Sequence, residues 1–262
     1  MRQSDNAAPA DLDDLALAIT ACRAGGEQAA SHFRKVQAVN KAEGGDYDPV
    51  TEGDKSAERA VRAVLEAGRP DDDILGEEFG FRDTGSDRRW VIDPIDGTRA
   101  FVCGTPTWGT LVGLQTGGAY TLGAAFQPLV GDMFSGDGDQ AFLNGAAIST
   151  RKGADMDDLR LATTDDILID EPYRDNFQAL KAKSAITRYG LDWYAYGLLA
   201  AGYIDVVFEC GLQLYDIAAL VPIVRGAGGI VTDVRGGQDI GPTVVAAANA
   251  AVHEHALSIL NR

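Results

Sequence analysis

Acidic residues follow apolar runs at several places in this chain. In the stretch WVIDPIDGT, residues 90–98, Asp93 and Asp96 bracket Pro94 and Ile95, and a glycine and a threonine follow at once. Burying a carboxylate without compensation costs free energy, so several such acids at one place need cations between them. The arrangement favours a metal site built from carboxylate oxygens. The other acids at ends of apolar elements are Asp54, Glu77 with Glu78, and Asp216.

The DPIDGT turn itself is suited to holding metal ions and a phosphate. Pro94 fixes its own φ and restricts Asp93, which makes the turn stiff. A stiff turn holds two carboxylates and the Ile95 carbonyl in one geometry, as the near-octahedral oxygen coordination of Mg²⁺ requires. Gly97 permits close approach of the backbone to a ligand, and Thr98 stands where a helix with free N–H groups can begin. These features outline a two-metal phosphoryl-transfer site, and the alternative is an Asx turn with a helix N-cap.

Composition excludes some partners and narrows the choice of metal. The 262 residues carry a formal net charge of −16, which disfavours nucleic acid and anionic membrane as partners. No apolar run reaches the roughly 18 residues of a membrane span. Three scattered cysteines without a C-x-x-C motif predict reduced thiols and a cytoplasmic location. Three histidines at unsuitable spacing leave a hard, oxygen-liganded cation as the expected metal.

The elements that must position these residues change character along the chain. Apolar periodicity predicts a helix within residues 11–38, bent or loosened at Gly25-Gly26, and a second helix over 54–67. From Arg89 onward, short strands follow one another, with a hairpin at Gly117-Gly118, which predicts a mostly antiparallel sheet. The later part alternates strand and helix, including one helix over 214–229. We expect an α+β fold in which layers of helix and sheet alternate.

Domain organisation follows from the same change of pattern. A boundary near residue 150 divides an N-terminal α+β half, 1–150, which carries most candidate ligands, from a C-terminal α/β half, 151–262. The second half supplies Asp216 and the substrate-side residues. We expect the two halves to pack as one compact unit.

Four segments, in order, resemble the inositol-monophosphatase-like superfamily of magnesium-dependent, lithium-sensitive phosphatases. They are DPVTEGDKSAE at 48–58, ILGEE at 74–78, WVIDPIDGT at 90–98 and LYDIAALVPIVRGAGGIVTD at 214–233. The resemblance implies a layered α-β-α-β-α sandwich with an antiparallel N-terminal sheet and a mixed C-terminal sheet. It also implies a homodimer and two to three Mg²⁺ ions in each active site.

The resemblance assigns the metal ligands residue by residue. Glu77 and Asp93, with the carbonyl of Ile95, ligate the first metal. Asp93, Asp96 and Asp216 ligate the second, so that Asp93 bridges the two. Glu77 also holds a weaker third metal through water.

The same resemblance assigns the residues that act on water and phosphate. Thr98 and Asp54 orient the attacking water, with Asp54 accepting a hydrogen bond from the threonine, and Glu77 assists through its metal. The backbone N–H groups of Gly97 and Thr98 receive the phosphate. Lys41 stands where the family often carries a metal-loop lysine, or is a solvated loop lysine. Glu78 lies behind the ligands or faces solvent.

The substrate prediction rests on residues 188–216. The superfamily hydrolyses inositol phosphates, fructose bisphosphate, 3'-phosphoadenosine nucleotides and histidinol phosphate, and AYGLLAAGYIDVVFECGLQLYDIAAL is most similar to the bacterial histidinol-phosphatase branch. Histidinol phosphate carries an amine and an imidazole, both able to be cationic, which suits the acids Asp192 and Glu209. Arg188 would meet the phosphate or a carboxylate. The alternatives are that Asp192 caps the 191–200 helix and Glu209 ends a strand on the surface.

One departure from that branch affects the pocket. Trp193 follows Asp192 where the branch often has a cysteine, so that an indole either reshapes the pocket or belongs to the core. The expected activity is hydrolysis of L-histidinol phosphate to L-histidinol, a step of histidine biosynthesis. The alternative is an inositol monophosphatase, or another sugar or 3'-nucleotide phosphatase. A non-catalytic protein that binds metal or a phospholigand is disfavoured because every expected ligand is present.

Overall fold

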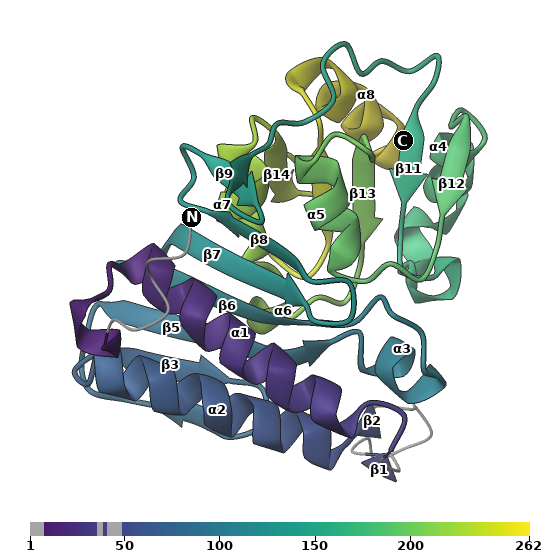
Figure 1. The fold of residues 1–262 in the computed structure, drawn as a ribbon. Coiled ribbons are helices and arrows are strands. Elements are labelled where there is room, and N and C mark those ends of the chain that lie inside the picture. The colour runs from purple at the N-terminus through teal and green to yellow at the C-terminus, as the bar shows by residue number, and fades with distance from the viewer. Residues whose placement is uncertain (1–7, 36–38, 41–48) are drawn as a thin grey trace.

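The computed structural model describes residues 8–35, 39–40 and 49–262 (Figure 1). The chain begins with a 3-10 turn, Pro9–Asp11, and the helix α1, Asp14–His32. Two short strands, β1 (Val39–Asn40) and β2 (Pro49–Val50), pair antiparallel and lead into α2, Glu52–Gly68. Lys41 lies outside the described residues. Within the described part of the chain, no helix combines the length and the apolarity needed to cross a membrane.

An eight-stranded sheet forms the N-terminal half. Its strand order is β10-β9-β8-β7-β6-β5-β3-β4, and all neighbouring pairs are antiparallel except β3 with β5. The predicted hairpin at Gly117-Gly118 joins β6 and β7 and is confirmed. A short helix, α3 (Thr98–Cys103), follows β5. The strands are β3 (Asp73–Gly76), β4 (Gly80–Arg82), β5 (Arg88–Asp96), β6 (Gly109–Thr116), β7 (Ala119–Gln127), β8 (Asp132–Gly136), β9 (Ala141–Leu143) and β10 (Ala146–Ala147).

A five-stranded mixed sheet forms the C-terminal half. Its order is β12-β11-β13-β15-β14, parallel from β12 to β13 and antiparallel from β13 to β14. Its strands are β11 (Arg160–Ala162), β12 (Ile186–Arg188), β13 (Val206–Glu209), β14 (Ile230–Asp233) and β15 (Val244–Ala247). The helices are α4 (Arg174–Lys181), α5 (Tyr194–Ala200), α6 (Leu214–Ile217), α7 (Leu220–Gly226) and α8 (Ala250–Leu260), with 3-10 turns at Asp166–Leu168 and Glu171–Tyr173.

The two sheets are separated and covered by layers of helix (Figure 1). Helices α1 and α2 lie together across one face of the eight-stranded sheet, and α6 and α7 lie on its other face. Beyond α5 and α7 comes the five-stranded sheet, whose outer face is covered by α4 and α8. Separate apolar clusters fill the spaces between these layers. The predicted layered α-β-α-β-α fold, with one mostly antiparallel and one mixed sheet, is confirmed.

The structure corrects two expectations about helices. Helix α1 is continuous through Gly25-Gly26, and close packing accounts for the glycines: a Cβ at Gly25 would lie 2.5 Å from Val61 Cγ2. The single helix expected over 214–229 is instead divided into α6 and α7. Pro222 has no N–H to donate to the carbonyl four residues earlier, that of Ala218, and its ring crowds that carbonyl. The helix is interrupted at Ala218 and Ala219, between the end of α6 and the start of α7.

The change from the first sheet to the second falls between Ala147 and Arg160. A domain boundary near residue 150 stays a prediction. The connecting segment is tied to the second sheet by Arg151, whose guanidinium binds the buried carboxylate of Asp205 just before β13.

Candidate active site

A cavity of about 550 Å³ lies where the ends of β3 and β5 meet α3, α5, α6 and the end of β13. It brings together residues from both halves of the chain that are separated by more than a hundred positions. Of the residues predicted from the sequence, it is lined by Glu77, Asp93, Ile95, Asp96, Gly97, Thr98, Asp192, Glu209 and Asp216.

Three carboxylates form the centre of this site. Asp93, Asp96 and Asp216 each place one oxygen within 4.8 Å of the others. Asp93 is buried, and its Oδ1 atom has no hydrogen-bond partner within the described part of the chain. Buried polar atoms are almost always satisfied, so an unpaired carboxylate oxygen facing two more carboxylates fits a bound cation. The donor set is entirely oxygen, which suits a hard cation such as Mg²⁺.

The pKa values of these groups indicate how a positive charge would affect the cluster. Burial is the largest cause that raises the pKa of Asp93 well above its usual range, and the charges of Glu77, Asp96 and Asp216 raise it further. Burial, together with the charges of Asp216 and Asp192, also raises the pKa of Asp96, and burial raises the pKa of Asp216 to about 6. A cation between the three would stabilise their charged forms.

The end of β5 shows how the sequence builds this geometry. The pairing of β5 with β6 shifts between Asp93 and Asp96, so the two aspartates lie on either side of one irregularity in the ladder. The Pro94 carbonyl accepts a hydrogen bond from Thr110 Oγ1 at 2.7 Å, and Thr98 Oγ1 donates to the Ile95 carbonyl at 3.0 Å. Both bonds fix the turn that the sequence predicted to be stiff.

Gly97 has a specific conformational role. Its φ of 83° lies in the left-handed region, which a glycine adopts without strain, and it forms the N-cap of α3. A Cβ at this position would lie 3.2 Å from the carboxylate of Asp192. The helix-start interpretation of DPIDGT therefore describes α3 correctly, and the carboxylate cluster stands beside it.

Glu77 reaches the cluster because β3 and β5 are parallel neighbours. Parallel strands end at the same edge of a sheet, and Gly76, the last residue of β3, pairs with Ile92 directly before Asp93. The Glu77 N–H donates to the Ile92 carbonyl at 3.3 Å. Among neighbouring charges, that of Glu77 is the largest contributor to the raised pKa of Asp93. Glu78 is half-buried and does not line the cavity.

Asp54 does not accept the hydrogen bond from Thr98 that the resemblance implied, within the described contacts. It is the third residue of α2, and its Oδ2 accepts hydrogen bonds from the N–H and the hydroxyl of Thr51, each at 2.7 Å, in a capping box. Burial raises the pKa of Asp54 to about 6. The expected hydrogen bond from Thr98 is absent from the described contacts, because the single hydroxyl proton of Thr98 is donated to Ile95 instead.

The two substrate-side acids both line the cavity. Glu209 ends β13, accepts hydrogen bonds from the N–H and hydroxyl of Thr164 at 2.7 and 3.0 Å, and has its pKa raised by burial to about 8. Because Glu209 is buried, the surface alternative is wrong. Burial also raises the pKa of Asp192 to about 6. The helix-cap alternative for Asp192 is wrong as well, since α5 begins at Tyr194 and Trp193 occupies its N-cap.

Trp193 is both core and cavity wall. Its side chain is buried and meets the Phe134 ring edge-on, with ring centroids 6.0 Å apart. Gly109 makes room for it, since a Cβ there would lie 2.4 Å from the indole. The core interpretation is confirmed, and the indole also contributes to the cavity lining.

Arg188 is not brought to the site. It lies exposed on β12, the edge strand of the second sheet, opposite Ala162, so the expectation that it meets the substrate is corrected. The cation that the sequence interpretation missed is Arg99, the sole lysine or arginine among the described residues that line the cavity. Arg99 could have been predicted from the sequence, because it directly follows Gly97 and Thr98, which were expected to bind the phosphate.

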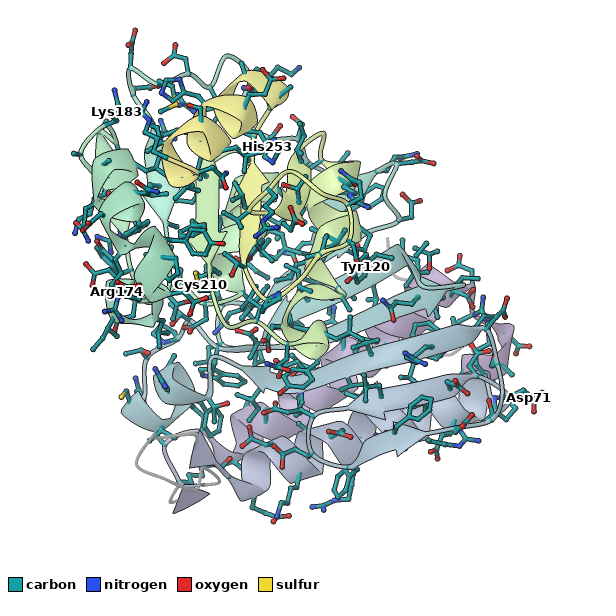
Figure 2. All side chains as sticks on the ribbon, turned by 180° about the vertical axis from the view of Figure 1, so that it is seen from behind. Asp71, Tyr120, Arg174, Lys183, Cys210 and His253 are labelled. Carbon is teal, nitrogen blue, oxygen red and sulfur yellow. The ribbon has the colours of Figure 1, made fainter. Side chains whose placement is uncertain are left out.

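Tyr196 was missed as well. Its hydroxyl is buried in the cavity lining with no hydrogen-bond partner among the described residues. Cys210, labelled in Figure 2, follows Glu209 in the part of the C-terminal half that faces the N-terminal half, and it also lines the cavity. All three cysteines are free thiols.

Comparison with known proteins identifies relatives over nearly the whole chain. Residues 11–262 match the inositol monophosphatase family. The bifunctional phosphatase IMPL2 of Arabidopsis thaliana is 36% identical, over 97% of this chain and 79% of that protein. The histidinol-phosphatase of Chlorobaculum parvum is 35% identical, over 90% of this chain and 93% of that protein. A solved inositol monophosphatase from Zymomonas mobilis has a TM-score of 0.83 at 38% identity, covering 95% of this chain and 98% of that one.

The sequence, the fold and the geometry of the site all indicate the same family. The family is metal-dependent, generally with Mg²⁺, and the carboxylate cluster fits such an ion. This chain therefore belongs to the inositol monophosphatase family and is a phosphoric monoester hydrolase that acts on small phosphate esters.

Proposed function

We propose that this enzyme hydrolyses L-histidinol phosphate to L-histidinol and phosphate. The observation that carries the proposal is the pair of acids, Asp192 and Glu209, that lines the same cavity as the carboxylate cluster. Burial raises the pKa of both, and the charge of Asp192 raises that of Glu209 further. A cationic group on the substrate would offset this cost, and histidinol phosphate supplies an amine and an imidazole.

A relative described by name supports this choice of ester. The Chlorobaculum parvum protein is a histidinol-phosphatase and covers most of this chain at 35% identity. A neutral polyol phosphate would supply no positive charge to the buried Glu209 or the half-buried Asp192. Arg99, which lines the same cavity, lies close enough to Asp192 for its charge to lower the pKa of that acid.

The proposed mechanism gives each residue of the site a separate role. Glu77, Asp93, the Ile95 carbonyl, Asp96 and Asp216 would hold two to three Mg²⁺ ions, and the ions would supply positive charge to the phosphate and a lowered pKa to a bound water. The N–H groups of Gly97 and Thr98 bind phosphate oxygens at the start of α3. Thr98 and Asp54 orient the attacking water, for which the Thr98 hydroxyl has to turn away from the Ile95 carbonyl.

The alternative is an inositol monophosphatase or another sugar or 3'-nucleotide phosphatase. The observation in its favour is the match to the Zymomonas mobilis inositol monophosphatase at 38% identity. Trp193 stands in the cavity wall where the histidinol-phosphatase branch often has a cysteine, and its indole changes the shape offered to the ester. We further propose a homodimer in the cytoplasm, which light scattering of the purified protein checks in part.

A phosphate-release panel decides between the esters. Purified enzyme with Mg²⁺ is assayed on histidinol phosphate, inositol 1-phosphate, fructose 1,6-bisphosphate and a 3'-phosphonucleotide. We expect kcat/KM to be highest for histidinol phosphate. Equal or faster turnover of inositol 1-phosphate would contradict the proposal, and release from none of the esters would contradict a phosphatase altogether.

A further inference from the structure

We propose that Glu58, together with Arg62, is a positioning residue for the metal-ligand turn and sets the affinity of the site for magnesium. The inference rests on the proposed role of Glu77 as a metal ligand. Glu58 is not among the cavity-lining residues and touches no reacting group. It acts on the backbone that carries Glu77.

The first observation is that the Glu58 carboxylate lies beneath the turn that follows β3. Glu58 is completely buried. Its Oε2 accepts the backbone N–H of Glu78 at 2.7 Å, and its Oε1 accepts the backbone N–H of Phe79 at 3.2 Å. These are the first two N–H groups after Glu77. One carboxylate thus fixes the path of the chain immediately beyond the ligand.

The second observation is that the residue before Glu77 has no room for a side chain. Gly76 ends β3, and a Cβ there would lie 2.0 Å from Glu58 Oε1 and 2.4 Å from its Cδ. Non-bonded atoms do not approach this closely, so any side chain at position 76 would displace the carboxylate or the turn. The glycine and the buried glutamate fit each other.

The third observation is the charge that balances Glu58. Arg62, one helical turn further along α2, donates from Nε to Glu58 Oε1 at 2.7 Å and from Nη2 to the Gly80 carbonyl at 2.5 Å. A buried carboxylate without such a partner would be strongly destabilising. Both residues therefore hold the turn. Glu58 accepts from the N–H groups of residues 78 and 79, and Arg62 donates to the carbonyl of Gly80.

The spacing along α2 connects this clamp to the active site. Residues four apart lie on one face of a helix, so Asp54 and Glu58 project from the same side of α2. The helix that carries Asp54 thus also fixes the turn that carries Glu77. Partners that orient metal ligands typically change metal affinity about 10- to 100-fold when they are mutated.

Glu58→Gln tests the proposal because glutamine keeps the size of the side chain and loses one acceptor. Its amide NH₂ would face an N–H donor or the guanidinium, so at least one of the three contacts breaks. We expect the dissociation constant of Mg²⁺, measured by calorimetry without substrate, to rise about 10- to 100-fold. The magnesium concentration for half-maximal activity should rise in parallel, while kcat at saturating magnesium largely recovers.

Two further variants separate positioning from folding. Gly76→Ala leaves the glutamate intact but displaces it, and it should weaken magnesium binding in the same direction. Glu66→Gln, on an exposed part of α2, is the matched control and should leave magnesium affinity unchanged. If Glu58→Gln does not fold, Arg62→Lys replaces it: lysine cannot bridge Glu58 and Gly80 as the guanidinium does, and the same shift is expected.

The outcomes are distinct. A Glu58→Gln protein that melts at a lower temperature but binds magnesium as the wild type does would overturn the proposal, because the clamp would then serve stability alone. Unchanged melting and unchanged affinity would overturn it as well. Failure of the proposed function is seen separately, in the ester panel with the wild-type enzyme, because magnesium binding is measured without any ester.

Discussion

The carboxylate of Asp96 accepts a hydrogen bond from the backbone N–H of Trp193 at 3.1 Å. Asp96 ends a strand of the first sheet, and Trp193 is the N-cap of α5 in the second half. This contact spans 97 positions in the sequence and joins the carboxylate cluster to the segment that carries Asp192. The residues proposed for phosphate chemistry and those proposed for ester recognition are therefore fixed relative to each other.

Asp93→Asn should abolish turnover while sparing the fold. The substitution removes the ligand predicted to bridge both metals, and a loss of about 4 kcal/mol of transition-state stabilisation corresponds to a fall in kcat of roughly a thousandfold. The melting temperature without metal should not decrease, because burial and neighbouring acids already disfavour the charge of Asp93. Phosphate release and thermal melts measure both. Asp139→Asn, on the exposed surface, is the control, and a near-normal rate at saturating magnesium would refute the ligand assignment.

Glu209→Gln should discriminate between esters. The pKa of Glu209 is raised to about 8 by burial, so near neutrality the free enzyme holds this carboxyl mostly protonated. A cationic substrate favours the charged carboxylate, so the KM for histidinol phosphate should fall as the pH rises towards 8. A charged hydrogen bond contributes about 1.5–3 kcal/mol, and its loss should raise KM about 10- to 100-fold near pH 8.5.

The comparison with the variant isolates the contribution of Glu209 from titration of the substrate itself. In Glu209→Gln the pH dependence of KM should be smaller, and KM for inositol 1-phosphate should change little. Steady-state kinetics on both esters across this pH range provide the check. An equal effect on both esters would argue against Glu209 as a cation-binding residue.

Arg151→Met should destabilise the whole protein. Arg151 donates from Nε and Nη2 to the two carboxylate oxygens of Asp205, each at 2.8 Å, and Asp205 is completely buried. Removing one partner of a buried ion pair leaves an uncompensated charge, which costs about 3–5 kcal/mol. Urea denaturation measures the free energy of unfolding. Asp158→Asn breaks the exposed arm of the same network and should cost much less, so equal losses would contradict the argument.

His253 should make stability depend on pH. It lies on α8 (Figure 2), its Nε2 is 2.8 Å from Thr232 Oγ1, and burial lowers its pKa below the ordinary 6.5. The Thr232 hydroxyl donates its proton to the Asp233 carbonyl, so the neutral imidazole must donate to Thr232. Protonation is disfavoured in the folded state, so the unfolded chain binds more protons at pH values between the two pKa values.

The folded state is therefore more stable at higher pH. The stabilisation that comes from the neutral His253 is complete above about pH 6.5 and is lost as the pH falls through the lowered pKa of the folded state. The free energy of unfolding should therefore drop between about pH 7.5 and pH 5.5, and the drop should be smaller in His253→Gln. Urea titrations at both pH values measure it. An identical drop in the variant would show that other groups are responsible.

The sequence by itself determined the elements and the chemical character of the site. Strand β5, its stiff double-aspartate turn and the glycine at the start of α3 are local features, because proline geometry, glycine conformation and apolar periodicity act over a few residues. The sequence alone also indicated that the expected metal ligands are all oxygen donors and that the four family-like segments occur in the family's order.

Tertiary structure decided which of these residues meet. Asp216 joins Asp93 and Asp96 because α6 packs on the sheet that contains β5. Arg188 does not line the cavity, because it lies on an edge strand of the second sheet. The role of Glu58 is visible only when α2 lies against the turn after β3. These contacts form only when strand order and helix packing bring together residues that are tens of positions apart in the sequence. A local sequence pattern does not encode which distant residues meet.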